Sequence, residues 1–378
     1  MADVRESLLY YRYNRTTGPL FCGRLLLDSP DLAKEEDDLD PDYGHSSSMF
    51  FGMHHALTDG TSNMHIFRFF ISILNDVIAN KPINDEEPMG TFISWEENIK
   101  VMEKNKELLQ SDPTLMAKLV SEKRFIKETT PLFISVFPPS KDPTKTVDII
   151  KILDQSTTDA FIQKCKREKV TVNSAVTAFV NAALVEIFVE NGLIQDSYPL
   201  MNRHLVNLRR YWDIKVDTAL GCNIHAMCQN VDTPRNIEHQ VWDYARSLNR
   251  VIQDDVELGK VFLEMAFDDL KLSISAKDFE KYLLSSKKFN CDFIMSNLGN
   301  VTSLVTEGGD YVRITQVLGS TSIDKFHFPV IINCRTFRGK FTIIFSYNAG
   351  FVQKDIAEKL CSIIVKRISG VQLQKLQN

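Results

Sequence analysis

The sequence predicts a mixed α/β or α+β protein built from two halves. Helical patterns and β-rich runs are mixed along the 378 residues, and no repeat of about 20 to 50 residues is found. A chain of this length is long for one hydrophobic core, so two domains are expected. The best boundary is the proline-rich stretch at 138–145, which predicts an N-terminal half over 1–140 and a C-terminal half over 141–378.

The first 45 residues contain few elements. A short helical stretch precedes a strand within GPLFCGRLLL (18–27). The acidic run at 31–44 is expected to be a solvated loop, because its like charges repel and it has little apolar surface. Farther on, residues 82–110 are polar and contain three breakers, which predicts a loop followed by a helix rich in Glu and Lys.

The most informative stretch is HHALTDG at 54–60. The run SMFFGM (48–53) before it is expected to be a buried strand. After it, apolar residues recur at helical spacing from Thr61 onward, with Thr61 or Ser62 as the expected N-cap. The stretch is therefore predicted to lie at a strand-to-helix junction.

The second half restarts the pattern with a strand at 146–153 and a helix from about Ser156. The segment 171–190 is apolar on a wide face, which predicts a helix buried on most sides. The remaining expected elements are strands at 201–212, 222–231, 289–300 and 310–319, a hairpin at 329–348 with Gly339 at its turn, and a terminal helix at 354–369.

Composition excludes several classes of function. A net charge of -5 and a pI near 6.0 do not favour nucleic-acid binding. Seven cysteines, an odd number without CxxC spacing, argue against a disulfide framework and fit a reducing compartment. The N-terminus lacks a signal-type apolar region, and no run was found that approaches the roughly 18 apolar residues of a membrane span. We therefore expect a cytoplasmic protein without a transmembrane segment.

Several familiar catalytic sites are missing from the sequence. It contains no GxSxG, no GxxxxGK[ST], no GxGxxG after a strand and no HExxH. His55 and Asp59 are spaced as HxxxD and His65 follows, but no second ligand cluster accompanies them. Because zinc sites recruit three or four protein ligands, no metal site is expected.

The two histidines have two open interpretations. Either one is a satisfied core residue at a strand end, or one is chemically active. Adjacent side chains on a strand point to opposite faces, so only one of His54 and His55 faces a cleft while the other packs. Gly60 removes a side chain where the chain turns into the helix, which leaves room for a ligand.

The motif also resembles that of a known family. HHALTDG matches HHxxxDG of the CoA-dependent acyltransferase superfamily, whose members have the chloramphenicol acetyltransferase-like or condensation-domain fold. The resemblance is nearest to the alcohol acetyltransferase and polyketide-associated acyltransferase subgroup, since the plant-type DFGWG motif is absent. It covers nearly the whole chain in the family's order, through GPLFCGRLLL, VTVNSAVTAFVNAAL, VNLRRYW, SNLGN and FRGKFTIIFSYN.

The resemblance implies two chloramphenicol-acetyltransferase-like subdomains with an active-site channel at their interface. It also implies a reaction in which His55 is a general base: it takes a proton from an alcohol or amine, which attacks the thioester of acyl-CoA or of a carrier-protein phosphopantetheine. An imidazole titrates near neutral pH and suits this role. No acyl-enzyme is needed, and no cofactor is expected to be bound permanently.

The resemblance assigns structural roles to other residues. His54 is expected to pack beside the base, and Asp59 to form a buried ion pair with Arg209 rather than with the neighbouring Arg210. Ser296 and Asn297 (the start of SNLGN) are expected either to stabilise the oxyanion or simply to form a turn after a strand.

One departure from the family qualifies this interpretation. Members usually place HHxxxDG more than a hundred residues into the chain, whereas here it begins at residue 54. By typical domain size, about 70 residues of the first subdomain are expected to be missing. Two hypotheses follow: an acyltransferase, which the intact motif favours, or a non-catalytic, truncated descendant that acts in binding or assembly.

Overall fold

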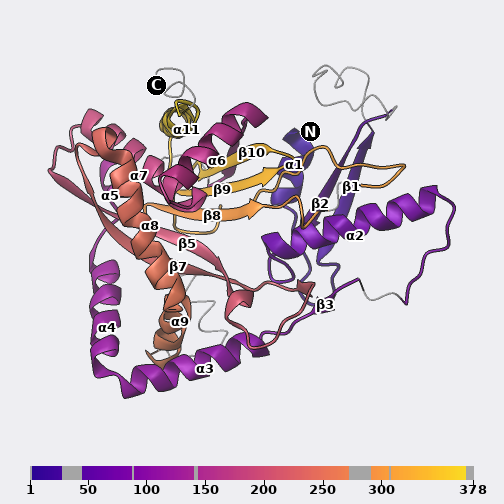
Figure 1. The fold of residues 1–378 in the computed structure, drawn as a ribbon, viewed down its shortest axis with the longest axis horizontal. Helices are drawn as coiled ribbons and strands as arrows, with labels where there is room; N and C mark the ends of the chain where they lie inside the picture. The colour runs from indigo at the N-terminus through magenta and orange to yellow at the C-terminus, as the bar shows by residue number, and fades with distance from the viewer. Residues whose placement is uncertain are drawn as a thin grey trace. The chain divides into compact units, whose positions relative to one another are not determined.

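The chain divides into two units that do not follow its linear order. The computed structural model describes residues 2–27, 45–86, 89–139, 144–271, 291–305 and 308–371 (Figure 1). Unit 1 comprises Met1–Trp95, Asp213–Asn223 and Asn300–Ser322, and unit 2 comprises Glu96–Trp212, Ile224–Gly299 and Ile323–Asn378. The acidic run at 31–44 lies outside the described residues.

This division differs from the predicted halves at 1–140 and 141–378. The helices α3 (Glu96–Ser111) and α4 (Pro113–Glu128) belong to unit 2, because they pack on α9 (Lys260–Lys271). Their shared cluster contains the buried side chains Leu109, Leu119, Leu263, Ala266 and Phe267. A proline-rich composition marked a break in the pattern, but these long-range apolar contacts decide which residues pack together.

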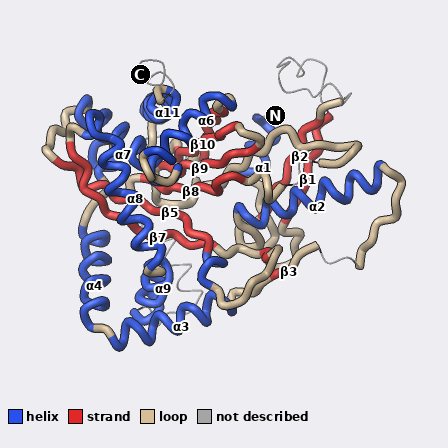
Figure 2. The backbone as a smooth tube through the Cα atoms, viewed as in Figure 1, coloured by secondary structure: helices blue, strands red, loops and turns tan. Residues whose placement is uncertain are grey.

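Unit 2 is built on one six-stranded mixed sheet, visible in Figures 1 and 2. The strand order is β4-β10-β9-β8-β5-β7, in which β5 pairs with β7 antiparallel and with β8 parallel. Their bounds are Thr146–Ile152 (β4), Ser197–Asn207 (β5), Ile224–Pro234 (β7), Phe293–Asn300 (β8), Val330–Phe337 (β9) and Lys340–Asn348 (β10). The predicted hairpin at 329–348 is confirmed: Arg338 and Gly339 form its two-residue turn with φ of 48° and 75°.

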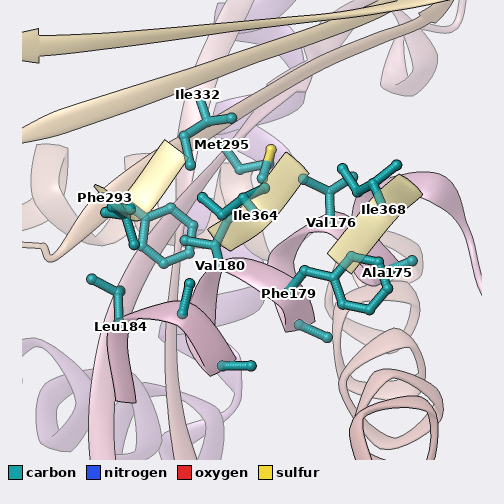
Figure 3. Packing of buried hydrophobic residues seen from close by; sticks show 14 of the residues in the cluster. Ala175, Val176, Phe179, Val180, Leu184, Phe293, Met295, Ile332, Ile364 and Ile368 are labelled. Atoms are coloured by element: carbon teal, nitrogen blue, oxygen red, sulfur yellow. The ribbon is translucent and has the colours of Figure 1, made fainter. Parts of the chain in front are cut away.

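The core of unit 2 is centred on α7 (Val172–Glu190), whose buried face is shown in Figure 3. Strand alternation directs Phe293 and Met295 toward this helix, while Ile294 between them belongs to a different cluster. The helices α6 (Gln155–Arg167), α8 (Val241–Glu257) and α11 (Lys354–Ser369) pack around α7. The predicted burial of α7 on most sides is confirmed.

Contrary to the prediction that no segment is long and apolar enough to cross a membrane, this helix is, judged by length and composition alone. In the structure, 78% of its most apolar window is buried inside the protein. That burial explains the composition, since a helix enclosed by a sheet and other helices has almost no polar face.

Two predicted strands in the second half are corrected. The strand expected at 201–212 ends at Asn207 and continues as a 3-10 turn, η3 (Leu208–Tyr211), because the Asn207 side chain accepts a hydrogen bond from the Arg209 amide at 3.1 Å. The segment expected to be a strand at 310–319 has only an isolated bridge between Gly308 and Arg313 among its described residues. The helices α4, α8 and α9, and the short α5 (Leu132–Val136), were not identified from the sequence.

Unit 1 is organised around α2 (Gly60–Ile78). It also contains α1 (Ala2–Leu9) and two small sheets, one from β1 (Phe21–Leu27) and β2 (Ser47–Met53), the other from β3 (Thr91–Phe92) and β6 (Ala219–Leu220). Contrary to prediction, β2 is mostly half-buried, since the sheet it forms has only two strands.

Polar side chains on α2 hold the two returning segments of unit 1. The Arg68 guanidinium donates to the Thr218 hydroxyl at 3.1 Å. Farther along the helix, the Asn75 side chain accepts from the amides of Tyr311 and Val312 at 3.0 Å and donates to the Val312 carbonyl at 3.1 Å. These contacts explain why residues so distant in sequence belong to the first unit.

Candidate active site

The predicted strand-to-helix junction is present between β2 and α2. The His54 amide donates to the Leu20 carbonyl at 2.8 Å, which continues the pairing of β1 and β2 by one residue. The Leu57 amide then donates to the His54 carbonyl at 2.9 Å and closes a turn. His55 therefore lies in the turn itself, directly after the last hydrogen bond of the strand.

The two histidines have different surroundings. His54 is half-buried, its ring lies edge-on to that of Tyr13 with centroids 5.8 Å apart, and its Nδ1 accepts from the Ala56 amide at 3.2 Å. Burial and the neighbouring Cys22 raise the pKa of Tyr13, so this phenol stays protonated beside His54. His55 is exposed. This difference is compatible with the predicted packing role of His54, and the catalytic role of His55 stays a prediction.

Asp59 is the N-cap of α2, which corrects the predicted cap at Thr61 or Ser62. Its side chain is 1% exposed, and its Oδ1 accepts from the Ser62 amide at 2.9 Å. Its Oδ2 accepts from the Asn223 amide at 2.8 Å, so one carboxylate joins the helix start to a segment 164 residues away. Gly60 is the first residue of the helix. The aspartate of the motif thus has a structural role within unit 1.

The segment at 221–223 is held from both sides by the first turn of α2. The Ser62 hydroxyl donates to the Gly221 carbonyl at 2.8 Å and accepts from the Gly221 amide at 3.1 Å. Asp59 binds the Asn223 amide, so the residues on both sides of Cys222 are held by hydrogen bonds. Its Sγ lies 3.5 Å from the Nδ1 of His55.

Cys222 was missed as a site residue from the sequence. It is half-buried, as is Cys22, whereas the other five thiols are buried, and none of the seven cysteines forms a disulfide. The sequence feature that marks this position is the preceding glycine, Gly221, which has a φ of +123° in the structure, a conformation that favours glycine. Its partner, His55, is 167 positions away along the chain, so only the fold brings the two together.

Arg209 lies in unit 2, in the turn after β5. It is half-buried, its Nη1 donates to the Asn207 side chain at 3.2 Å, and its guanidinium lies 6.0 Å from the centroid of the Trp212 ring. The neighbouring Arg210 is exposed, so Arg209 is the more buried of the two. Asp59 belongs to unit 1, so the ion pair between Asp59 and Arg209 stays a prediction.

Ser296 and Asn297 are half-buried near the end of β8, also in unit 2. The Asn297 side chain accepts from the Gly299 amide at 2.8 Å, and Gly299 has a φ of +69°. This contact fits the interpretation of a turn at the strand end. Their role at an oxyanion stays a prediction.

Among the described residues, no group of three or more His, Cys, Asp or Glu side chains is arranged to hold a metal ion. His65, the third histidine near the motif, is buried on α2. The reactive groups at the junction are an exposed imidazole and a neighbouring thiol. The segments that carry them are joined by buried hydrogen bonds from side chains to backbone groups.

Comparison with protein families gave one match. The model described as "Phthiocerol/phthiodiolone dimycocerosyl transferase C-terminus" matches residues 147–343, just over half of the chain. The match begins well after the HHALTDG motif, so it is independent of the residues on which the predicted resemblance chiefly rests. Comparison with curated protein sequences found no match.

Solved structures resemble the chain over most of its length. The trichothecene 15-O-acetyltransferase TRI3 from Fusarium sporotrichioides has a TM-score of 0.64 at 12% identity, covering 95% of this chain and 72% of that one. The EpoB cyclization-docking bidomain from Sorangium cellulosum has a TM-score of 0.60 at 12% identity, covering 98% and 66%. Polyketide synthase associated protein 5 from Mycobacterium tuberculosis has a TM-score of 0.54 at 14% identity, covering 95% and 77%. At these identities the similarity concerns the fold, and it confirms the predicted fold class.

Proposed function

The chain belongs to the family of the phthiocerol/phthiodiolone dimycocerosyl transferase C-terminus, and on that premise we propose that it moves an acyl group from a thioester to an alcohol or amine. The family and the fold support a function of the acyltransferase or condensation type, and they bear out the resemblance to CoA-dependent acyltransferases. The observation that carries the finer proposal is the exposed His55 in the turn that directly precedes the buried Asp59 cap.

In the proposed reaction, the Nε2 of His55 takes the proton from the acceptor hydroxyl or amine. The acceptor atom forms a bond to the thioester carbonyl carbon, and the carbonyl electrons move to the oxygen. When the tetrahedral intermediate collapses, the carbon–sulfur bond breaks and the departing thiolate takes the proton back from the imidazolium. General base catalysis of this kind contributes about 10² to 10⁴ in rate, and positioning of the two substrates contributes much of the rest.

The donor is proposed to be acyl-CoA or an acyl-phosphopantetheine on a carrier protein, as a co-substrate. Two of the similar structures support a tethered donor, since one is a cyclization-docking bidomain and the other a polyketide synthase associated protein. Ser296 and Asn297 are candidates to stabilise the oxyanion, as polar groups at the end of a strand of the large sheet. Comparing free acyl-CoA with acyl carrier protein at equal concentration separates the two donors.

The test is release of free thiol from a panel of acyl-CoAs in the presence of short alcohols and amines. We expect the wild-type chain to release thiol at least about 100 times faster than His55→Ala, the lower range for loss of a general base. The matched control is His239→Ala, since His239 is an exposed histidine of unit 2 beside Glu238 and should be dispensable.

Equal thiol release by wild type and His55→Ala, with CoA and with carrier protein, would contradict the proposal. That result would favour the alternative, in which a non-catalytic descendant of this fold acts in binding or assembly.

A further inference from the structure

The contact between His55 and Cys222 has no role in the reaction as described so far. The Sγ to Nδ1 separation of 3.5 Å is within hydrogen-bonding range for sulfur. Within the described part of unit 1, no other side chain makes a hydrogen bond to the His55 ring. A catalytic histidine is ordinarily oriented through the nitrogen that does not react, often by a carboxylate or a carbonyl. Here a thiol is at that nitrogen.

The position of the thiol is set by the start of α2. Ser62 binds both the amide and the carbonyl of Gly221, and Asp59 binds the amide of Asn223. Both of these side chains are buried, each at 1% exposure. The backbone on both sides of Cys222 is therefore fixed by two buried sets of hydrogen bonds, and this backbone places the thiol within reach of His55.

The chemistry of the pair allows two proton arrangements. If the thiol donates to Nδ1, the neutral ring carries its proton on Nε2, and Nε2 then has no lone pair to take a proton from the substrate alcohol or amine. If Nδ1–H donates to the sulfur, Nε2 is left unprotonated and is available as a base. A cysteine sulfur is both a weak donor and a weak acceptor, so its type alone does not decide between them.

We propose that Cys222 is a positioning residue for His55, whose sulfur accepts the Nδ1–H and thereby keeps Nε2 free as the base. This inference rests on the proposed function, because only a base requires that nitrogen to be unprotonated. The neighbouring His54 is in the opposite state: its Nδ1 accepts from the Ala56 amide, so its neutral ring carries the proton on Nε2. The adjacent histidines of the motif are thus expected to be opposite tautomers.

The test is nitrogen NMR of the full chain with ¹⁵N-labelled histidine, recorded above about pH 8, where ordinary histidines are neutral. His54→Gln and His55→Gln assign the two rings. We expect the Nδ1–H tautomer for His55 and the Nε2–H tautomer for His54 in wild type. Cys222→Ala should shift the His55 tautomer ratio toward Nε2–H by about three- to tenfold, the range expected for one weak hydrogen bond. Cys222→Ser, which keeps an acceptor, should restore it.

The outcomes separate this inference from the proposed function. The tautomer is measured without substrate, so a chain that releases no thiol but shows the expected tautomers supports the inference and contradicts the function. An Nε2–H tautomer for His55 in wild type overturns the inference, and so does an unchanged ratio in Cys222→Ala. Unchanged His54 signals would show that Cys222→Ala keeps its fold. If that variant does not fold, the tautomer of His55 in the wild-type spectrum decides whether the inference holds.

A kinetic measurement adds a second readout. If the chain transfers acyl groups, Cys222→Ala should lower kcat by a similar factor of about three to ten and leave KM unchanged, because a tautomer shift reduces the active fraction without changing substrate contacts. Recovery of kcat in Cys222→Ser is expected. A rise in KM with unchanged kcat would instead indicate that Cys222 binds substrate, and would overturn the positioning role.

Discussion

Asp59 provides the sharpest test of the junction, because its two carboxylate oxygens have separate tasks. Oδ1 accepts from the Ser62 amide and caps α2, while Oδ2 accepts from the Asn223 amide and holds the segment that carries Cys222. In Asp59→Asn one oxygen remains, and asparagine caps helices as well as aspartate does. The other position becomes an amide nitrogen, so one buried backbone N–H is left facing a second donor.

These two contacts set the minimum of the expected cost. A buried donor without an acceptor costs about 1 to 3 kcal/mol, so Asp59→Asn should lower the free energy of unfolding by about 2 kcal/mol. Asp59→Ala also removes the helix cap, which adds about 1 kcal/mol, for a total of about 3 kcal/mol.

Asp112 is a matched control at the start of α4. A single oxygen, Oδ1, accepts from both the Thr114 and Leu115 amides, at 2.9 and 3.0 Å. Asparagine keeps that oxygen, so Asp112→Asn should change the free energy of unfolding by less than about 0.5 kcal/mol, as is usual away from special features. Asp112→Ala should cost about 1 kcal/mol, the value of a lost cap.

The assay is urea unfolding combined with amide hydrogen exchange at Ser62 and Asn223. Exchange locates the effect in unit 1, since local opening lowers the protection of the affected amides first. Asp59→Asn should selectively expose one of these two amides, and Asp59→Ala both. The reasoning is refuted if Asp59→Asn is no more destabilising than Asp112→Asn, or if both amides keep their wild-type protection in Asp59→Ala.

Three further predictions concern other parts of the chain. Burial lowers the pKa of His204 from 6.5 to about 4, so the unfolded chain binds this proton first on acidification; urea unfolding should show that wild type loses more stability than His204→Gln between pH 6.5 and 4. Gly221→Ala places a methyl carbon 2.9 Å from a side-chain nitrogen at a φ of +123°, and thermal unfolding should show a greater loss of stability than in Gly192→Ala, where the space is open; equal losses would contradict this. An alkylating reagent should modify Cys22 and Cys222 in the folded chain, as detected by mass spectrometry, because burial raises the pKa of the other five thiols to about 11 or 12 (Cys165, Cys228, Cys291, Cys334, Cys361). Rapid modification of a third thiol would refute this expectation.

Local signals predicted much of the fold correctly. The hairpin around Gly339 and the helix at 354–369 were predicted within a residue, because turn chemistry and helical periodicity are properties of neighbouring residues. The N-cap of α2 was placed two or three residues late, since Asp59 was assigned to an ion pair and not considered as a cap. The strand expected at 310–319 was also predicted wrongly. Its composition is typical of a strand, but its backbone amides at Tyr311 and Val312 bind the Asn75 side chain instead of a neighbouring strand.

The sequence by itself determined the strand-to-helix junction, because a strand, a turn and a helix start are encoded within about 30 consecutive residues. The fold class followed from the mixture of helical and β-rich segments along the chain, and the choice of His55 over His54 followed from the family resemblance. Only the tertiary structure decided which residues form unit 1 and which group lies against His55. Cys222 reaches that nitrogen because Asp59 and Ser62 hold its neighbours from more than 150 positions away. These hydrogen bonds join the side chains of Asp59 and Ser62 to backbone groups of a distant segment, and because every residue carries such backbone groups, no local pattern in the sequence identifies the ones that are bound.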